Sequence, residues 1–110
     1  MGTESLRDKE CIACEGGIPP LTTDRAVALL AQLNEWRMDG ERILKDYTFK
    51  NFKETVGFVN TVASLAEKEG HHPDLFIHDY KILTITLTTH AAKGLTENDF
   101  ILAAKIDALD

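Results

Sequence analysis

The chain has 110 residues and a formal net charge of −6, because 18 Asp and Glu residues outnumber 12 Lys and Arg residues. This length accommodates one domain. The acidic balance disfavours nucleic acids and anionic membrane surfaces, both of which bind clustered Lys and Arg. No apolar run approaches the ~20 residues of a membrane span, and no apolar secretory segment follows the first charges. We therefore expect a cytoplasmic protein with no nucleic-acid partner and no membrane partner.

The beginning of the chain shows no helix or strand pattern. Residues 1–10 are polar and charged, and Gly16-Gly17 and Pro19-Pro20 interrupt regular structure. We expect residues 1–15 to form a flexible N-terminal arm. We expect residues 16–110 to form a single domain.

The arm contains a C-x-x-C pair, Cys11 and Cys14, which three hypotheses can explain. Half of a zinc site would need two more ligands, and His71 and His72 are the obvious candidates. A redox pair normally begins a helix within a βαβ unit, and no such pattern follows here. We favour the third hypothesis, two free thiols, and we expect no metal and no cofactor.

A helix pattern and a hairpin pattern follow the arm. Thr22 or Thr23 can cap a helix in which apolar residues recur every three or four positions as far as Leu33. Residues 36–41 and 42–49 are predicted to be two short strands. The dipeptide Asp39-Gly40 between them is typical of a hairpin turn.

The clearest helix is predicted over residues 51–69. Its apolar residues form a wide face, which is typical of a helix covered on more than one side. We expect the sheet on one side and another subunit on the other, so that the protein forms a homodimer or homotetramer. Gly70 is typical of a helix C-terminus, and Pro73 prevents the helix from resuming.

Two strands and a helix complete the chain. Residues 75–77 are a short candidate strand, and residues 80–89 alternate Leu and Ile with Thr, a β-branched pattern typical of strands. Thr96 can cap a last helix. The short connections favour an α+β fold, a four-stranded antiparallel sheet with about three helices packed on one face. The opposite face would carry the threonines of residues 80–89 and stay open.

Three of the four histidines fall in two motifs, His71-His72-Pro73 and Thr89-His90. Imidazole titrates near neutrality, so clustered histidines are suited to proton transfer. A helix dipole could explain one histidine after a helix, but not an adjacent pair. On extended backbone the pair would point to opposite faces, so one of the two can pack rather than react. A zinc hydrolase usually has His-x-x-x-His on one helix, which this spacing fits poorly, so we favour a metal-free acid/base site.

Two carboxylates lie near these motifs. Glu67 precedes His71 by one helical turn, which can bring a carboxylate to an imidazole, although it could equally be an exposed helix residue. Asp99 lies in the first turn of the last helix, where it could belong to the site or could simply stabilise the helix dipole. His78 is outside both motifs, and we expect it at the surface.

The motifs resemble the pterin-4a-carbinolamine dehydratase family over residues 11–108. His-His-Pro alone is a weak signal, but followed by Thr-His and Gly-Leu-Thr in this order and spacing it is specific. The matching residues are Glu67, His71-His72-Pro73-Asp74, Thr89-His90, Gly94-Leu95-Thr96 and Asn98-Asp99-Phe100, with Pro20-Leu21-Thr22 and Phe58-Val59-Asn60 upstream.

This resemblance implies an enzyme, 4a-hydroxytetrahydrobiopterin dehydratase, a hydro-lyase. Family members convert the 4a-carbinolamine of a tetrahydropterin to the quinonoid dihydropterin in pterin recycling. They need no metal or redox cofactor, and they form dimers and dimers of dimers. By resemblance, the proton transfers are carried by His71, His72 and His90, and substrate binding or support comes from Glu67, Pro73 and Asp99.

Two positions depart from the family pattern, and two other functions stay open. Leu75 stands where many relatives have a Trp that could cover the pterin ring, and Gly70 stands where some have Asp. The chain could instead be a protein-binding module, a dimerisation or transcriptional coactivator partner that uses the helix over residues 51–69. It could also have a dehydratase-like role in molybdopterin metabolism.

Overall fold

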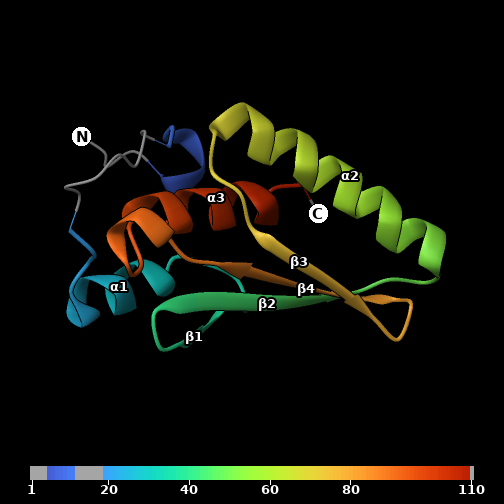
Figure 1. Ribbon diagram of the computed structural model, residues 1–110, viewed down its shortest axis with the longest axis horizontal. Coiled ribbons are helices and arrows are strands. Elements are labelled where there is room, and N and C mark those ends of the chain that lie inside the picture. The colour runs from blue at the N-terminus through green and yellow to red at the C-terminus, as the bar shows by residue number, and fades with distance from the viewer. Residues whose placement is uncertain (1–4, 12–18, 110) are drawn as a thin grey trace.

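The computed structural model, which describes residues 5–11 and 19–109, confirms the predicted α+β fold. A four-stranded antiparallel sheet lies beneath helices that cross one of its faces (Figure 1). The elements are η1 (Leu6–Asp8), α1 (Thr23–Leu30), β1 (Arg37–Asp39), β2 (Arg42–Thr48), α2 (Phe52–Glu69), β3 (Asp74–His78), β4 (Ile82–Leu87), η2 (His90–Ala92) and α3 (Glu97–Asp107).

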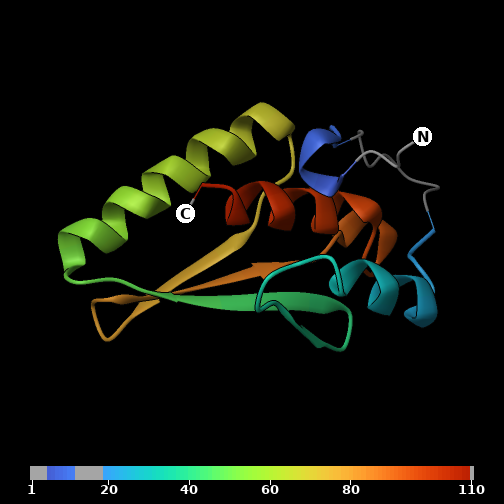
Figure 2. The same ribbon diagram turned by 180° about the vertical axis from the view of Figure 1, so that it is seen from behind.

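The sheet has the strand order β1-β2-β4-β3, so β2 and β4 are its central strands. Ile43 of β2 lies opposite Leu87 of β4, and Tyr47 lies opposite Leu83. These residues are buried and face α2 and α3, which lie over the same side of the sheet in both views (Figures 1 and 2). Helix α1 lies beside the β1–β2 hairpin and adds Ala26 and Leu29 to the same core.

A buried lysine interrupts the apolar pattern of β2. Lys45 has only 6% of its surface exposed, and its Nζ donates to Asp107 Oδ1 at 2.8 Å. The same carboxylate oxygen accepts hydrogen bonds from Trp36 Nε1 at 2.9 Å and Tyr47 Oη at 3.1 Å. A buried charge is tolerated when it is paired and hydrogen-bonded, so Asp107 joins the C-terminal end of α3 to the sheet.

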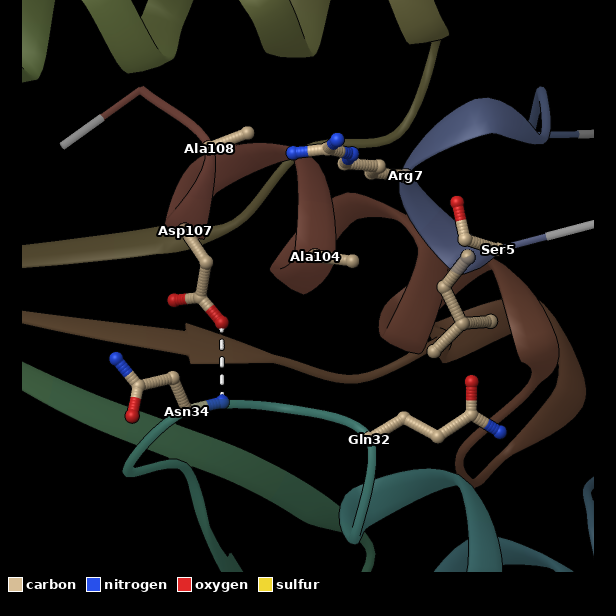
Figure 3. Close-up of a pocket in the computed structure, with 8 residues that line it drawn as sticks. Ser5, Arg7, Gln32, Asn34, Ala104, Asp107 and Ala108 are labelled. Atoms are coloured by element: carbon tan, nitrogen blue, oxygen red, sulfur yellow. Dashed lines mark hydrogen bonds between the residues drawn. The ribbon is translucent and has the colours of Figure 1, made fainter.

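A small polar pocket of about 280 Å³ opens beside Asp107 (Figure 3). Its walls come from η1, from residues 32 and 34, and from the last turn of α3. Asp107 Oδ2 accepts a hydrogen bond from the backbone nitrogen of Asn34 at 3.2 Å, as Figure 3 shows. None of the three histidines of the predicted site lines this pocket.

One turn lies where the sequence predicted it, and another replaces the start of a predicted strand. Gly40 has φ 61°, as the Asp-Gly signal requires, and connects β1 to β2. The strand predicted over residues 80–89 begins only at Ile82, because Asp79 and Tyr80 have φ 49° and 51° and form the turn between β3 and β4. The first helix likewise ends at Leu30 and not near residue 33.

Helix α2 covers nearly the predicted range of residues 51–69, and both of its ends are capped. Asn51 Oδ1 accepts a hydrogen bond from the backbone nitrogen of Glu54 at 2.9 Å, and Gly70 ends the helix with φ 69°. The face toward the core buries Thr55, Val62 and Ala66. Whether a second subunit covers the rest of α2 stays a prediction.

The described part of the N-terminal arm packs against α3. Leu6, in η1, has 4% of its surface exposed and belongs to the hydrophobic core. Lys9 Nζ pairs with Glu97 at 2.8 Å, and Lys105 Nζ donates to the backbone oxygen of Arg7 at 2.9 Å. These contacts place residues 5–11 on the domain, whereas the flexibility of residues 1–15 as a whole stays a prediction.

Candidate active site

The centre of the candidate site is a buried imidazole–carboxylate pair. His71 follows Gly70 directly, so the end of α2 sets its position, and it is buried. Its Nε2 lies 2.6 Å from Oδ1 of Asp99, whose exposed fraction is 0%. Asp99 therefore does more than stabilise the first turn of α3, since it contacts a histidine 28 positions earlier in the chain.

The second oxygen of Asp99 is held by two threonines. Oδ2 accepts hydrogen bonds from Thr89 Oγ1 at 2.8 Å and from the backbone nitrogen of Thr96 at 3.0 Å. The hydroxyl groups of Thr89 and Thr96 are 2.8 Å apart. Thr96 is also the N-cap of α3, so helix capping and the orientation of Asp99 depend on the same residue.

The Gly94-Leu95-Thr96 motif fixes the loop that carries His90. Thr89 and Gly94 exchange two backbone hydrogen bonds, at 3.1 and 3.3 Å, which close this loop. A Cβ atom at Gly94 would lie 2.8 Å from Pro20 Cβ, so only glycine allows the close approach. The Leu21 backbone nitrogen donates to the Leu95 oxygen at 2.7 Å, which joins the Pro20-Leu21 motif to the same loop.

His72 is exposed, whereas the neighbouring His71 is buried. Its side chain is 61% exposed, and its Nε2 pairs with Glu67 Oε2 at 2.5 Å. The separation of one buried and one exposed histidine agrees with the expectation for adjacent residues on extended backbone. Glu67 is itself exposed, and the imidazole that it contacts is that of His72, because His71 turns away into the core.

His90 lies in the 3-10 turn η2 and is exposed at the edge of a pocket of about 510 Å³. The pocket carries both signs of charge and lies between the β1–β2 hairpin and the end of β4. His71 and His72 do not line this pocket. Pro73 is half-buried directly before β3. The pocket residues are Asp39, Gly40, Glu41, Arg42, Thr88, Thr89, His90, Lys93 and Gly94.

The sequence did not predict that Thr89 and Thr96 bind the carboxylate of Asp99. Thr89 links the buried pair to the pocket, because it bonds Asp99 and directly precedes His90. Only the Thr-His and Gly-Leu-Thr motifs could have drawn attention to it. His78, expected at the surface, is half-buried on the open sheet face, where its Nε2 lies 3.0 Å from Thr84 Oγ1.

The cysteine hypotheses are tested only at Cys11, because Cys14 lies outside the described residues. Burial, with Glu69 nearby, raises the pKa of the Cys11 thiol to about 12. Within residues 5–11 and 19–109, no group of three or more His, Cys, Asp or Glu side chains is arranged to hold a metal ion. No helix in these same ranges is long and apolar enough to cross a membrane.

Comparison with known proteins decides the family. The family model for pterin 4 alpha carbinolamine dehydratase matches residues 19–109. The chain belongs to this family. A relative from Rickettsia bellii is 49% identical over 109 residues, with 97% of this chain and 96% of the relative covered. One from Nitrosospira multiformis is 45% identical over 106 residues, with 96% and 93% covered. Both are named "Putative pterin-4-alpha-carbinolamine dehydratase".

Two solved structures are similar to this fold. A transcriptional coactivator/pterin dehydratase from Brucella melitensis has a TM-score of 0.77 and 35% identity, with 82% of this chain and 97% of that chain covered. A pterin dehydratase-like protein described as a RuBisCO assembly factor in the alpha-carboxysome has a TM-score of 0.58 and 28% identity, with 69% and 89% covered. The family therefore includes proteins whose described roles extend beyond dehydration.

Proposed function

We propose that this protein is a 4a-hydroxytetrahydropterin dehydratase that acts in tetrahydropterin recycling in the cytoplasm. The reaction breaks the bond between C4a and its hydroxyl group, which leaves as water after taking a proton. A proton is lost from the neighbouring ring nitrogen, and a carbon–nitrogen double bond forms. The reaction needs an acid and a base that work near neutral pH, and imidazole can serve as either.

The observation that carries this proposal is the buried His71–Asp99 pair joined through Thr89 to the loop of His90. In the proposed mechanism His71, His72 and His90 perform the proton transfers. Asp99 orients His71, Glu67 pairs with His72, and Pro73 fixes the backbone between the histidine pair and β3. His90 and Thr89 both line the pocket of about 510 Å³, and Thr89 also bonds Asp99 of the buried pair.

The experiment that tests this function is a direct assay with chemically generated 4a-hydroxytetrahydropterin. Purified protein should accelerate formation of the quinonoid dihydropterin above the spontaneous rate. Alanine substitution of His71, His72 or His90 should each slow turnover, by about 10²–10⁴-fold for a true general acid or base. Wild-type protein that leaves the spontaneous rate unchanged would contradict the proposal.

We also propose that the protein is a homodimer or homotetramer, with α2 in a subunit interface. Phe52 at the start of α2 is 54% exposed, and the helix presents part of its surface away from the sheet (Figure 1). A small domain gains stability by burying such surface. Light scattering at micromolar concentration should give at least twice the chain mass of 12.2 kDa, and a monomer mass would contradict this proposal.

A second candidate function is protein binding through the same surface of α2. It is favoured by the described roles of the two similar structures, one a coactivator and one an assembly factor. Substitution of Phe52 by Asp would separate the two functions. It should abolish partner binding or self-association. A monomeric dehydratase would keep its turnover, because Phe52 begins α2 whereas His71 and His72 follow the other end of that helix.

A further inference from the structure

Oδ2 of Asp99 accepts two hydrogen bonds, and Oδ1 faces a histidine ring nitrogen. Asp99 is fully buried, its Oδ1 faces His71 Nε2, and its Oδ2 faces the Thr89 hydroxyl and the Thr96 backbone N–H. An ionised carboxylate is the form of Asp that only accepts hydrogen bonds. With two donors on Oδ2, any proton shared by Asp99 and His71 lies between Oδ1 and Nε2.

Counting the hydroxyl protons gives these contacts a direction. Thr89 has one hydroxyl proton, and it donates this proton to Asp99 Oδ2. In the 2.8 Å contact between the two threonine hydroxyls, the donor must then be Thr96. The result is a directed chain in which Thr96 donates to Thr89 and Thr89 donates to Asp99.

The same reasoning fixes the proton on His71. One proton is shared in the 2.6 Å contact between Oδ1 and Nε2, and because imidazole is a stronger base than carboxylate, that proton lies on Nε2. Nε2 carries a proton in both the neutral ring and the charged ring. Nδ1 is consequently the only ring atom of His71 that gains or loses a proton during a reaction.

We infer that Thr89 is a positioning residue that orients the Asp99 carboxylate and thereby holds His71 in the tautomer with hydrogen on Nε2. Its backbone supports this role, because two hydrogen bonds hold Thr89 to Gly94 in the loop that leads into α3. The consequence for turnover rests on the proposed dehydratase function. The consequence for the His71 ring does not, so the two can fail separately.

The variant that tests this inference is Thr89→Val, which replaces the hydroxyl group by a methyl group in a side chain of similar shape. It removes one of the two donors to Oδ2 and leaves the Thr96 hydroxyl without its acceptor. Thr89→Ser restores the hydroxyl and is the rescue variant. Thr89→Ala makes the same test if valine prevents folding.

Thr84→Val is a matched control on the open face of the sheet. The Thr84 hydroxyl also donates to a carboxylate, Asp46 Oδ1 at 2.7 Å, and also contacts a histidine nitrogen, His78 Nε2 at 3.0 Å. The substitution therefore removes the same kind of hydrogen bond at a place that has no part in the candidate site. Its effects on the ring spectra should be confined to His78.

The measurement is the tautomeric state of each ring by long-range ¹H–¹⁵N correlation on protein labelled with ¹⁵N-histidine. Signals of His71 are assigned with His71→Gln. Wild type, Thr89→Ser and Thr84→Val should show His71 with hydrogen on Nε2, and Thr89→Val should show a mixture of tautomers. Turnover of Thr89→Val should fall about 10-fold at similar KM, the effect of losing one hydrogen bond to a charged group.

Two results would overturn the inference. One is a His71 ring that keeps hydrogen on Nε2 in both Thr89→Val and Thr89→Ala. The other is an equal change at His71 in Thr84→Val, which would indicate a general loss of structure. A wild-type protein without dehydratase activity whose His71 tautomer still responds to Thr89→Val would contradict the proposed function and support the positioning role.

Discussion

Replacing Asp99 with Asn should disable the site while preserving its shape. The amide presents one oxygen and one NH₂ group where the carboxylate presented two oxygens. Two donors, from Thr89 and Thr96, face the position of Oδ2, so the amide oxygen will occupy that position. The NH₂ group then faces His71 Nε2, which must accept a hydrogen bond, and the ring is forced to carry its proton on Nδ1.

The magnitudes follow from the same contacts. Turnover should fall about 10²–10⁴-fold, the range for loss of a general acid or base and for a histidine held in the wrong tautomer. Unfolding free energy should fall by only about 2 kcal/mol, because two hydrogen bonds to Oδ2 change from charge-assisted to neutral and each change is worth about 1 kcal/mol. A large effect on turnover with a small effect on stability distinguishes positioning from folding.

Stopped-flow absorbance of quinonoid dihydropterin formation measures turnover, and urea unfolding of the same preparation measures stability. Asp99→Ala is the comparison that removes every hydrogen bond of the side chain. A folded Asp99→Asn protein that turns over within threefold of wild type would refute the claim that Asp99 holds His71 in its working tautomer. A His71 ring that keeps hydrogen on Nε2 in Asp99→Asn would refute it as well.

Three further predictions test other parts of the molecule. His90→Ala should slow turnover by at least 10²-fold, whereas His78→Ala, on the open sheet face, should stay near wild type; equal damage in the same assay would invalidate the site assignment. Leu6→Ala should lower the unfolding free energy by about 2–3 kcal/mol in urea titrations, because Leu6 is in the core, and exposed Arg7→Ala should change it by less than about 0.5 kcal/mol. Burial is the chief cause that raises the pKa of the Cys11 thiol from 9.0 to about 12. The native state therefore keeps a proton that the unfolded chain releases above pH 9. Wild-type stability should therefore fall more between pH 9 and 12 than that of Cys11→Ala, and equal falls would show that the thiol is not buried in solution.

Local sequence signals predicted most of the fold because each marks a backbone conformation. Gly70 and Gly40 occupy positive φ at the positions where a helix end and a hairpin turn were expected. Asp79 and Tyr80 also have positive φ, but tyrosine is a strand former, so the sequence extended β4 into the turn. Leu6 escaped notice because a single apolar residue among charged neighbours has no periodicity.

The candidate site was predicted in part, because its residues come from segments far apart in the chain. Family membership agrees with the order and spacing of the histidine motifs, whereas the roles of the histidines stay a prediction. Glu67 contacts His72 and not His71, because helical spacing no longer applies beyond the left-handed residue Gly70. The contact between Thr89 and Asp99 joins the segment after β4 to the first turn of α3, and no local sequence pattern predicts it.

The most direct test of this account is the dehydration rate of 4a-hydroxytetrahydropterin with purified protein that has been treated with a chelator. Acid/base catalysis by histidines predicts that the treated protein accelerates the reaction as well as untreated protein does, and that added zinc changes nothing. Activity that disappears on chelation and returns with zinc would contradict the metal-free mechanism. A rate equal to the spontaneous one in both preparations would contradict the dehydratase function itself.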